Sequence, residues 1–333
     1  MSFVIDGSEW AFDGWSADDI DQALGHLSER VDVARSRGEN VWIGDDLQSR
    51  SVLGPLDVWS LWSEESPLHL PVELGRELAA MLRPLGGYLD EEPWPDGMEF
   101  TRVAIGDDLP VENEDVAWAH HHVRGDRAVA CLGLRRRGVF KTTTDAGSAQ
   151  VHWIVDEAEH RAFYRAAIDV ERDSEQTLER LSSHAFPDLC FVAGIWRELS
   201  AFAGGYTRVR KDLRRILAVL DDVGKWAFTE PPPKLQPTDE LPRESGEPGR
   251  LLIQQRFQAV GLDVAPEKAS VARTSRFSAP RERVVDGRTL YCEWHVKIAP
   301  HINRVHIHPP VPESGERLVV AIFHAHLPLP GDT

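Results

Sequence analysis

The sequence predicts an α+β protein built in two parts. Apolar residues recur at helical spacing in several segments, most clearly at Ile20, Leu24, Leu27, Val31 and Ala34. Elsewhere, short apolar runs lie between Gly, Pro and Asp residues, as is typical of strands joined by tight turns. With 333 residues, 42% of them hydrophobic, the chain is long enough for two domains that each bury a core.

Cysteine usage and hydropathy favour a cytoplasmic protein. The three cysteines, Cys131, Cys190 and Cys292, are far apart and form no CxxC pair, so neither a disulfide framework nor a structural zinc site is indicated. No apolar run approaches the roughly 20 residues that cross a bilayer. The first residues also lack the basic and apolar stretches of a secretory signal. We therefore expect no membrane contact.

Acidic side chains concentrate in the first third of the chain. Of the 54 acidic and 37 basic side chains, residues 1–116 hold 26 and 7, which leaves 28 and 30 for the remainder. A field of this sign repels nucleic acid. We therefore expect the acidic region to bind a protein partner or to restrain the C-terminal part, and we expect no DNA binding.

Residues 1–186 are predicted to form an acidic α+β domain with antiparallel strands. Ser16 is a favourable N-cap, and Asp19 complements the dipole of the helix that follows. The segment 124–127 resembles a hairpin turn between two strands. The expected elements, in order, are a helix from Ser16 to Gly38, a strand at 40–43, a helix at 72–83, strands at 116–123, 128–134 and 150–155, and a helix after Asp156.

Residues 187–333 are predicted to form a second domain, interrupted by a Pro-rich connector at 229–249. Short loops join its last three strands, so we expect an antiparallel meander that packs on a helical hairpin. The expected elements are a strand at 189–192, hairpin helices at 195–202 and 209–220, a helix at 251–260, and strands at 289–298, 303–308 and 317–326.

Charged and histidine side chains gather on one face of this meander. Side chains alternate between the two faces of a strand, so polar residues at alternate positions project together. Histidine titrates near neutrality and can act as acid or base, while lysine and arginine can hold a phosphate group. The residues expected on the outer face are Glu293, His295, Lys297, Arg304, His306 and His308.

The order of strand, helical hairpin and meander resembles the RelE/ParE superfamily of small bacterial toxins from Pro187 onward. The segments 293–297, 303–307 and 318–323 are similar to the central strands of those toxins. The long Pro-rich insertion and the acidic N-terminal region depart from the family pattern. The chain as a whole resembles uncharacterised proteins of high-GC bacteria.

This resemblance implies a metal-independent endoribonuclease that acts on messenger RNA at the ribosome, without a cofactor, in a toxin or phage-defence system. His295 and His306 would be the base and the acid, in either order, and Glu293 would orient one of them. Lys297 and Arg304 would hold the phosphate, and His308 is a further candidate. The alternative is a non-enzymatic subunit of a multiprotein complex that uses the same fold for docking.

Other hypotheses compete with this one. Alternating polar residues occur on the exposed face of any antiparallel sheet. His306, His308 and Glu313 have spacing similar to a cupin metal motif, which His295 could complete. A predicted strand would also place His120 and His122 on one face near His152, although hydrogen bonding is the commoner role of such a pair. The second hairpin helix has a basic face, formed by Arg208, Arg210, Lys211, Arg214 and Arg215. This face would bind RNA only if it lies beside the histidine-rich face of the meander.

Overall fold

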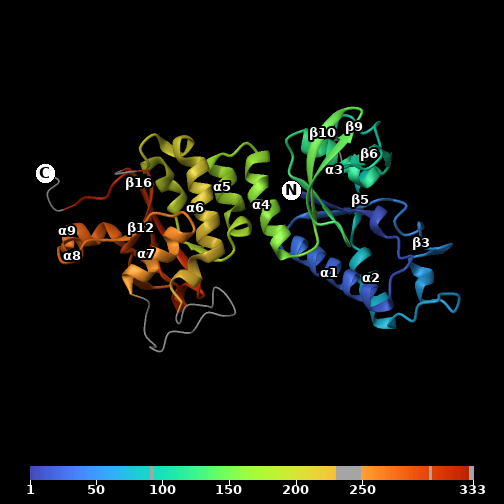
Figure 1. Ribbon diagram of the computed structural model, residues 1–333, viewed down its shortest axis with the longest axis horizontal. Coiled ribbons are helices and arrows are strands. Elements are labelled where there is room, and N and C mark those ends of the chain that lie inside the picture. Colours follow the sequence, from blue (N-terminus) through green and yellow to red (C-terminus); the bar gives the residue numbers. More distant parts are fainter. Residues whose placement is uncertain (91–93, 230–248, 300–301, 330–333) are drawn as a thin grey trace. The chain divides into compact units, whose positions relative to one another are not determined.

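The computed structural model describes residues 1–90, 94–229, 249–299 and 302–329 (Figure 1). The chain divides into two compact units, Met1–Arg172 (unit 1) and Asp173–Thr333 (unit 2). Both units contain helices and strands, which confirms the predicted α+β class. The division lies before the predicted one, so helix α5 (Glu175–Ala185) belongs to unit 2. Among the described residues, no helix is long and apolar enough to cross a membrane.

An eight-stranded mixed sheet forms the centre of unit 1. Its strand order is β5-β2-β1-β8-β10-β9-β6-β7. The first five strands in this order are parallel, and the last three are each antiparallel to the strand before. The predicted antiparallel arrangement therefore holds for one side of the sheet only. The strands are β1 (Ser2–Ile5), β2 (Asn40–Ile43), β5 (Gly86–Gly87), β6 (Arg102–Ile105), β7 (Val111–Glu112), β8 (Val129–Leu132), β9 (Gly138–Thr144) and β10 (Gly147–Ile154).

Helices cover both faces of this sheet. Successive residues of β1 point to opposite faces. Val4 packs in one core cluster with Trp118 of α3, whereas Phe3 contacts Phe163 of α4 at 5.3 Å between ring centroids. The helices are α1 (Ala17–Ser36), α2 (Val72–Leu82), α3 (Glu114–Arg124) and α4 (Glu157–Val170), and a small hairpin, β3 (Ser51–Leu53) and β4 (Leu56–Asp57), precedes α2. This two-sided burial explains why β1 and β8 are apolar at consecutive positions.

The prediction of a strand at 116–123 is wrong, because this segment is most of helix α3. Asn113 caps the helix, since its side chain accepts a hydrogen bond from the Val116 N–H at 3.0 Å. Every residue from Asp115 to His122 is buried. A segment that is buried on every side shows neither helical nor strand periodicity clearly. The predicted turn at 124–127 is the connection from α3 to β8.

Unit 2 contains a five-stranded sheet in the order β11-β17-β16-β15-β12. Its central strands β15, β16 and β17 form the predicted antiparallel meander, and the edge strand β11 is parallel to β17. The bounds are β11 (Leu189–Phe191), β12 (Val264–Pro266), β15 (Trp294–Ala299), β16 (Ile302–His308) and β17 (Leu318–His324). The helical segments are the 3-10 helix η4 (Ile195–Ala201), α6 (Gly205–Ala227), α7 (Arg250–Ala259), α8 (Ala269–Ala272), α9 (Ser275–Ser278) and the 3-10 helix η5 (Ala279–Arg281).

Two details of unit 2 differ from the prediction. The first hairpin helix is the 3-10 helix η4. The predicted strand 289–298 is broken at Cys292 and Glu293, so its first part, β14 (Arg288–Tyr291), pairs instead with β13 (Glu282–Val285). Most of the predicted connector at 229–249 lies outside the described residues.

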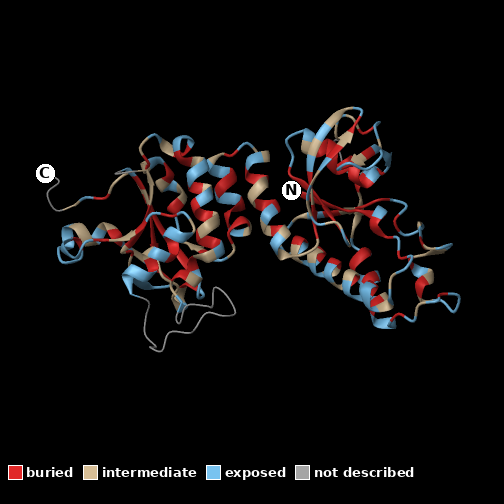
Figure 2. Ribbon diagram, in the orientation of Figure 1, coloured by how far each residue is buried: buried red, intermediate tan, exposed pale blue. Residues whose placement is uncertain are grey.

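Both faces of the unit 2 sheet are covered. Trp294 contacts Phe228, just after α6, at 5.7 Å between ring centroids, so the predicted apolar face packs on helices. On the opposite face, Leu290 of the β13–β14 hairpin belongs to one core cluster with Val319 and Ile322 of β17. The central strands of the sheet are therefore buried (Figure 2).

Candidate functional site

The structure brings together the two histidines that the sequence singled out in unit 2. His295 of β15 lies directly opposite His306 of β16, and Lys297 lies opposite Arg304. The two imidazole ring centroids are 5.4 Å apart. The strand parity used in the prediction is therefore confirmed for these four residues.

The expectation that this face opens to solvent is wrong. His295 is 6% exposed and His306 is fully buried. The cause is the break after β14, because the β13–β14 hairpin covers the face that a continuous strand would have left free. Burial, with Arg304 next in importance, lowers the pKa of His295 to about 3, and burial lowers the pKa of His306 well below its usual value. Neutral, covered rings do not suit acid–base chemistry on RNA.

The other predicted catalytic residues lie in separate places. Lys297 is paired with Asp263, with 3.0 Å between Nζ and Oδ2. Arg304 is half-buried, and burial lowers its pKa. Glu293 and His308 line a different pocket, of about 600 Å³, where Glu293 Oε2 is 2.6 Å from Arg250 Nη2. The six residues therefore do not form one cleft.

The predicted metal motif of His306, His308 and Glu313 is not formed. His308 Nδ1 lies 2.8 Å from the Pro309 carbonyl, and Glu313 is paired with Arg288 at 2.9 Å. Neither residue belongs to the group of possible metal ligands around His306. Among the described residues, the group that could hold a metal ion joins His306 to His295 and to Glu267 instead.

His120, His122 and His152 of unit 1 do not lie on one strand face. His120 lies on helix α3, where its two ring nitrogens contact the hydroxyls of Thr142 and Thr144 at 2.7 and 3.2 Å. His122 packs edge-on against Trp118 of the same helix. His152 contacts Phe163 of α4, which covers the other face of the sheet. The hydrogen-bonding interpretation of His120 is thus supported, and the shared strand face is wrong.

A candidate site that the sequence analysis did not find lies in unit 1. The chain leaves β1 through α1 to reach β2 on one side, and β8 lies on the other side of β1. The strand order therefore changes direction between β1 and β8. In open parallel sheets, ligands bind outside the carboxyl ends of the strands at such a switch point.

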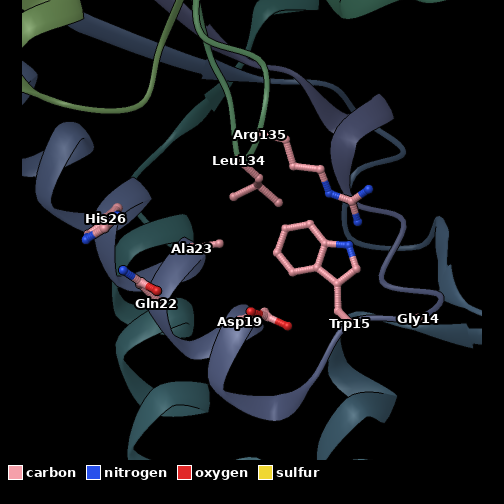
Figure 3. A pocket seen from close by; sticks show the side chains of 8 residues that line it. All are labelled: Gly14, Trp15, Asp19, Gln22, Ala23, His26, Leu134 and Arg135. Atoms are coloured by element: carbon pink, nitrogen blue, oxygen red, sulfur yellow. The ribbon is translucent and has the colours of Figure 1, made fainter.

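A pocket of about 350 Å³ lies where the loops after β1 and β8 meet helix α1 (Figure 3). The indole of Trp15 forms one side of it, across from Ala23, and the guanidinium carbon of Arg135 is 3.9 Å from the centroid of that ring. Arg135 is also fixed by a hydrogen bond from Nη2 to the Ala11 carbonyl at 2.8 Å. The lining residues are Gly14, Trp15, Asp19, Gln22, Ala23, His26, Leu134 and Arg135.

The buried carboxylate of Glu9 holds the β8 side of this pocket in place. Its two oxygens accept hydrogen bonds from the backbone N–H groups of Leu134, Arg135 and Arg136, at 2.6, 3.0 and 2.8 Å. Burial nevertheless raises the pKa of Glu9, and the charge of Asp6 adds to that rise. Three backbone donors on one side chain define the course of the loop that carries Leu134 and Arg135.

A second carboxylate is enclosed at the same edge of the sheet. Asp115 is 1% exposed, and its Oδ2 accepts a hydrogen bond from the Gly7 N–H at 2.9 Å. A Cβ atom at Gly44 would lie 2.4 Å from Asp115 Oδ1, so glycine is required there for this close approach. Burial, followed by the charge of Asp6, raises the pKa of Asp115 to about 7. The edge therefore contains an acid that titrates near neutrality.

The surroundings of the pocket are electronegative. Unit 1 has 33 acidic and 16 basic side chains, which leaves 21 of each in unit 2. In the pocket, hydrogen bonds from the Ser16 side chain and backbone keep the pKa of Asp19 below its ordinary value, so its carboxylate is charged at neutral pH. The lining thus combines one carboxylate, Asp19, with one guanidinium, Arg135, in a unit of net negative charge.

The comparisons with known proteins leave this site to be judged from its geometry. No protein-family model, curated protein or solved structure matches the chain. A sequence signal for the site does exist. The fully buried strands β1 and β8, apolar from Phe3 to Ile5 and from Val129 to Leu132, are each followed by a polar or glycine residue, Asp6 and Gly133. This is the pattern of parallel strands with a functional carboxyl edge.

Proposed function

We propose that unit 1 binds a small organic amine in the pocket formed by Trp15, helix α1 and the loop after β8. The observation that carries this proposal is the position of the pocket, at the carboxyl ends of parallel strands where the strand order changes direction. A volume of about 350 Å³ suits a molecule with one or two rings.

The lining defines the chemistry of this ligand. Trp15, Ala23 and Leu134 offer apolar surface for a ring. The guanidinium of Arg135 stacks on the Trp15 ring, so this ring takes part in a cation–π contact. The charged carboxylate of Asp19 supplies an acceptor for an ammonium group on the opposite side of the pocket from Arg135 (Figure 3). An arylalkylamine, in which an aromatic ring bears an aliphatic ammonium group, satisfies both parts of the lining.

A phosphate-bearing ligand fits less well, although the pocket adjoins the N-terminus of helix α1. Ser16 and Asp19 form a capping box, in which the Ser16 hydroxyl binds the Asp19 N–H and the Asp19 carboxylate binds the Ser16 N–H. The carboxylate therefore occupies the position that a phosphate would take at a free helix N-terminus. Its charge would repel an anion.

The test compares three ligands that share a ring and differ in charge: tryptamine, the uncharged 3-methylindole and the anionic indole-3-acetate. Binding to the full chain is measured by NMR titration of backbone amides. We expect tryptamine to bind most tightly and indole-3-acetate least tightly. Because an exposed ion pair contributes about 0.2–1 kcal/mol, the affinity for tryptamine should exceed that for 3-methylindole by about 1.4-fold to fivefold.

Two acids on the same helix turn provide a matched control. Asp19→Asn should remove the preference for the amine, because Asp19 lines the pocket. Asp18→Asn removes the same charge from the preceding residue, which does not line the pocket, and should leave that preference nearly unchanged. Equal binding of the three ligands, or equal effects of the two substitutions, would contradict the proposal. Trp15→Ala should weaken all three ligands together.

A further inference from the structure

We propose that unit 2 binds one divalent transition-metal ion, of the class that includes zinc, through Glu267, His295 and His306. Each of these residues offers one ligand atom, and the three atoms lie within 4.8 Å of one another. Two imidazole nitrogens and a carboxylate oxygen are ligands that zinc accepts in proteins. All three side chains are buried.

The sheet itself places the three ligands together. His295 and His306 are direct cross-strand neighbours on β15 and β16. On the other side of β15, Ala265 of β12 is opposite His295. Glu267 comes two residues after Ala265, and its backbone N–H donates to the Glu293 carbonyl at 2.7 Å. Residues two apart on an extended chain share a face, so Glu267 points to the side of the sheet that carries the histidines.

Within the described part of the chain, three of the four ring nitrogens of His295 and His306 are buried without a hydrogen bond of standard geometry. Among the described residues, neither ring nitrogen of His306 makes a hydrogen bond of standard geometry, and Nδ1 of His295 makes none. The backbone of Cys292 lies near enough to His306 to oppose the fall of its pKa, but burial prevails. Buried polar atoms without a partner are rare because each costs about 1–3 kcal/mol. A metal ion between the rings would satisfy a nitrogen on each.

Arg281 orients the carboxylate ligand. Its Nε donates to Glu267 Oε1 at 2.8 Å, and its Nη1 is held by the Phe277 carbonyl at 2.7 Å. The same oxygen of Glu267 is 3.7 Å from Nδ1 of His295. An outer hydrogen bond of this kind is common for carboxylate ligands, since it fixes their direction. The second oxygen of Glu267 remains for coordination, and a water molecule can complete the four ligands.

Electrostatics sets the expected strength of this site. Neutral imidazole is the form that binds a metal ion, and burial keeps both rings neutral at pH 7. Arg281 and Arg304 place positive charge nearby, which opposes a cation and should make binding weaker than in a zinc finger. The buried site joins the edge strand β12 to the central strands, so its role would be to stabilise unit 2.

The experiment uses the full chain, freed of metal with EDTA and then dialysed. Zn²⁺ is added, and its stoichiometry is measured by mass spectrometry of the dialysed protein, with ring ¹⁵N NMR of labelled histidine as an independent readout. We expect one ion per chain, shifts in the ring nitrogens of two histidines, and a higher unfolding temperature. No bound ion at equilibrium, or shifts confined to other histidines, would overturn the proposal.

Variants of two other histidines in this sheet give the control. His308→Ala and His324→Ala remove imidazoles that lie outside the group of three and should keep the stoichiometry. His295→Gln and Glu267→Gln should each weaken Zn²⁺ binding at least tenfold. If a variant fails to fold, the ring ¹⁵N spectrum of the unmodified chain still decides the outcome. Unchanged affinity in both folded variants would refute the assignment.

Discussion

Replacing Asp115 by Asn should remove a large pH dependence from the stability of unit 1. The pKa of Asp115 is raised from 3.8 to about 7, first by burial and then by the charge of Asp6. A tenfold change in proton affinity corresponds to about 1.4 kcal/mol. At pH values well above 7, ionisation of Asp115 therefore lowers the free energy of unfolding by about 4 kcal/mol.

The direction of this effect follows from proton binding in the two states. Between pH 4 and pH 7 the unfolded chain has released the proton of Asp115, whereas the folded chain retains it. The contribution to stability is thus complete below pH 4 and is lost as the pH rises toward 7. Buried histidines such as His120, whose pKa falls to about 4, act in the opposite direction over part of this window. The difference between two variants cancels their contribution.

The measurement is urea unfolding at several pH values. It is monitored by hydrogen exchange of peptides from β1 and β8, which report unit 1 alone. From pH 5 to pH 7, Asp115→Asn should gain about 2 kcal/mol relative to the unmodified chain. Asp145→Asn, a change at an exposed residue, should show no such trend. A constant difference across this range for Asp115→Asn would refute the reasoning.

Two further substitutions test contacts that the proposals use. Glu9→Gln leaves one fewer acceptor for the three backbone N–H groups of the β8 loop. The free energy of unfolding of unit 1, measured in urea, should therefore fall by about 1–3 kcal/mol. An unchanged value would contradict the anchoring role. Arg281→Met removes the buried partner of Glu267, and unit 2 should lose about 3–5 kcal/mol. Added Zn²⁺ should restore part of that loss, and a substitution without cost would show that the pair is not required.

The features of unit 2 that depend on strand parity could be predicted from the sequence. The alternation along 294–298 and 303–308 placed His295, Lys297, Arg304 and His306 on one face, and the register then sets His295 opposite His306 and Lys297 opposite Arg304. Exposure could not be predicted in the same way. It depended on where one apolar run is broken, at Cys292 and Glu293, and on the hairpin that this break creates. Local alternation does not say what covers a face.

The parallel core of unit 1 was not predicted, for two physical reasons. Parallel pairing joins β1, β2, β8 and β10 across long stretches of sequence, so no hairpin turn marks the neighbours. In addition, the segment 116–123 shows no polar stripe of helical or strand period, and its length and residues suit a strand or a helix. Asn113 followed by Glu114 was the available sign of a helix start.

The predicted RNA and protein partners remain predictions. The predicted catalytic pair is covered, and the 21 acidic and 21 basic side chains of unit 2 give it no net attraction for RNA. The predicted basic face of α6 is also partly engaged, since Arg214 Nη2 lies 3.3 Å from Asp173 Oδ2. The acidity of unit 1 still suits a basic protein partner.

The most direct test of the proposed amine site is chemical-shift mapping with tryptamine on the ¹⁵N-labelled full chain. The amides of Gly14, Trp15, Leu134 and Arg135 should shift in a saturable way, together with the indole N–H of Trp15. The amide chemical shifts of unit 2 should not change. Shifts spread over both units without saturation, or none in the two loops of the pocket, would contradict a site at this edge of the sheet.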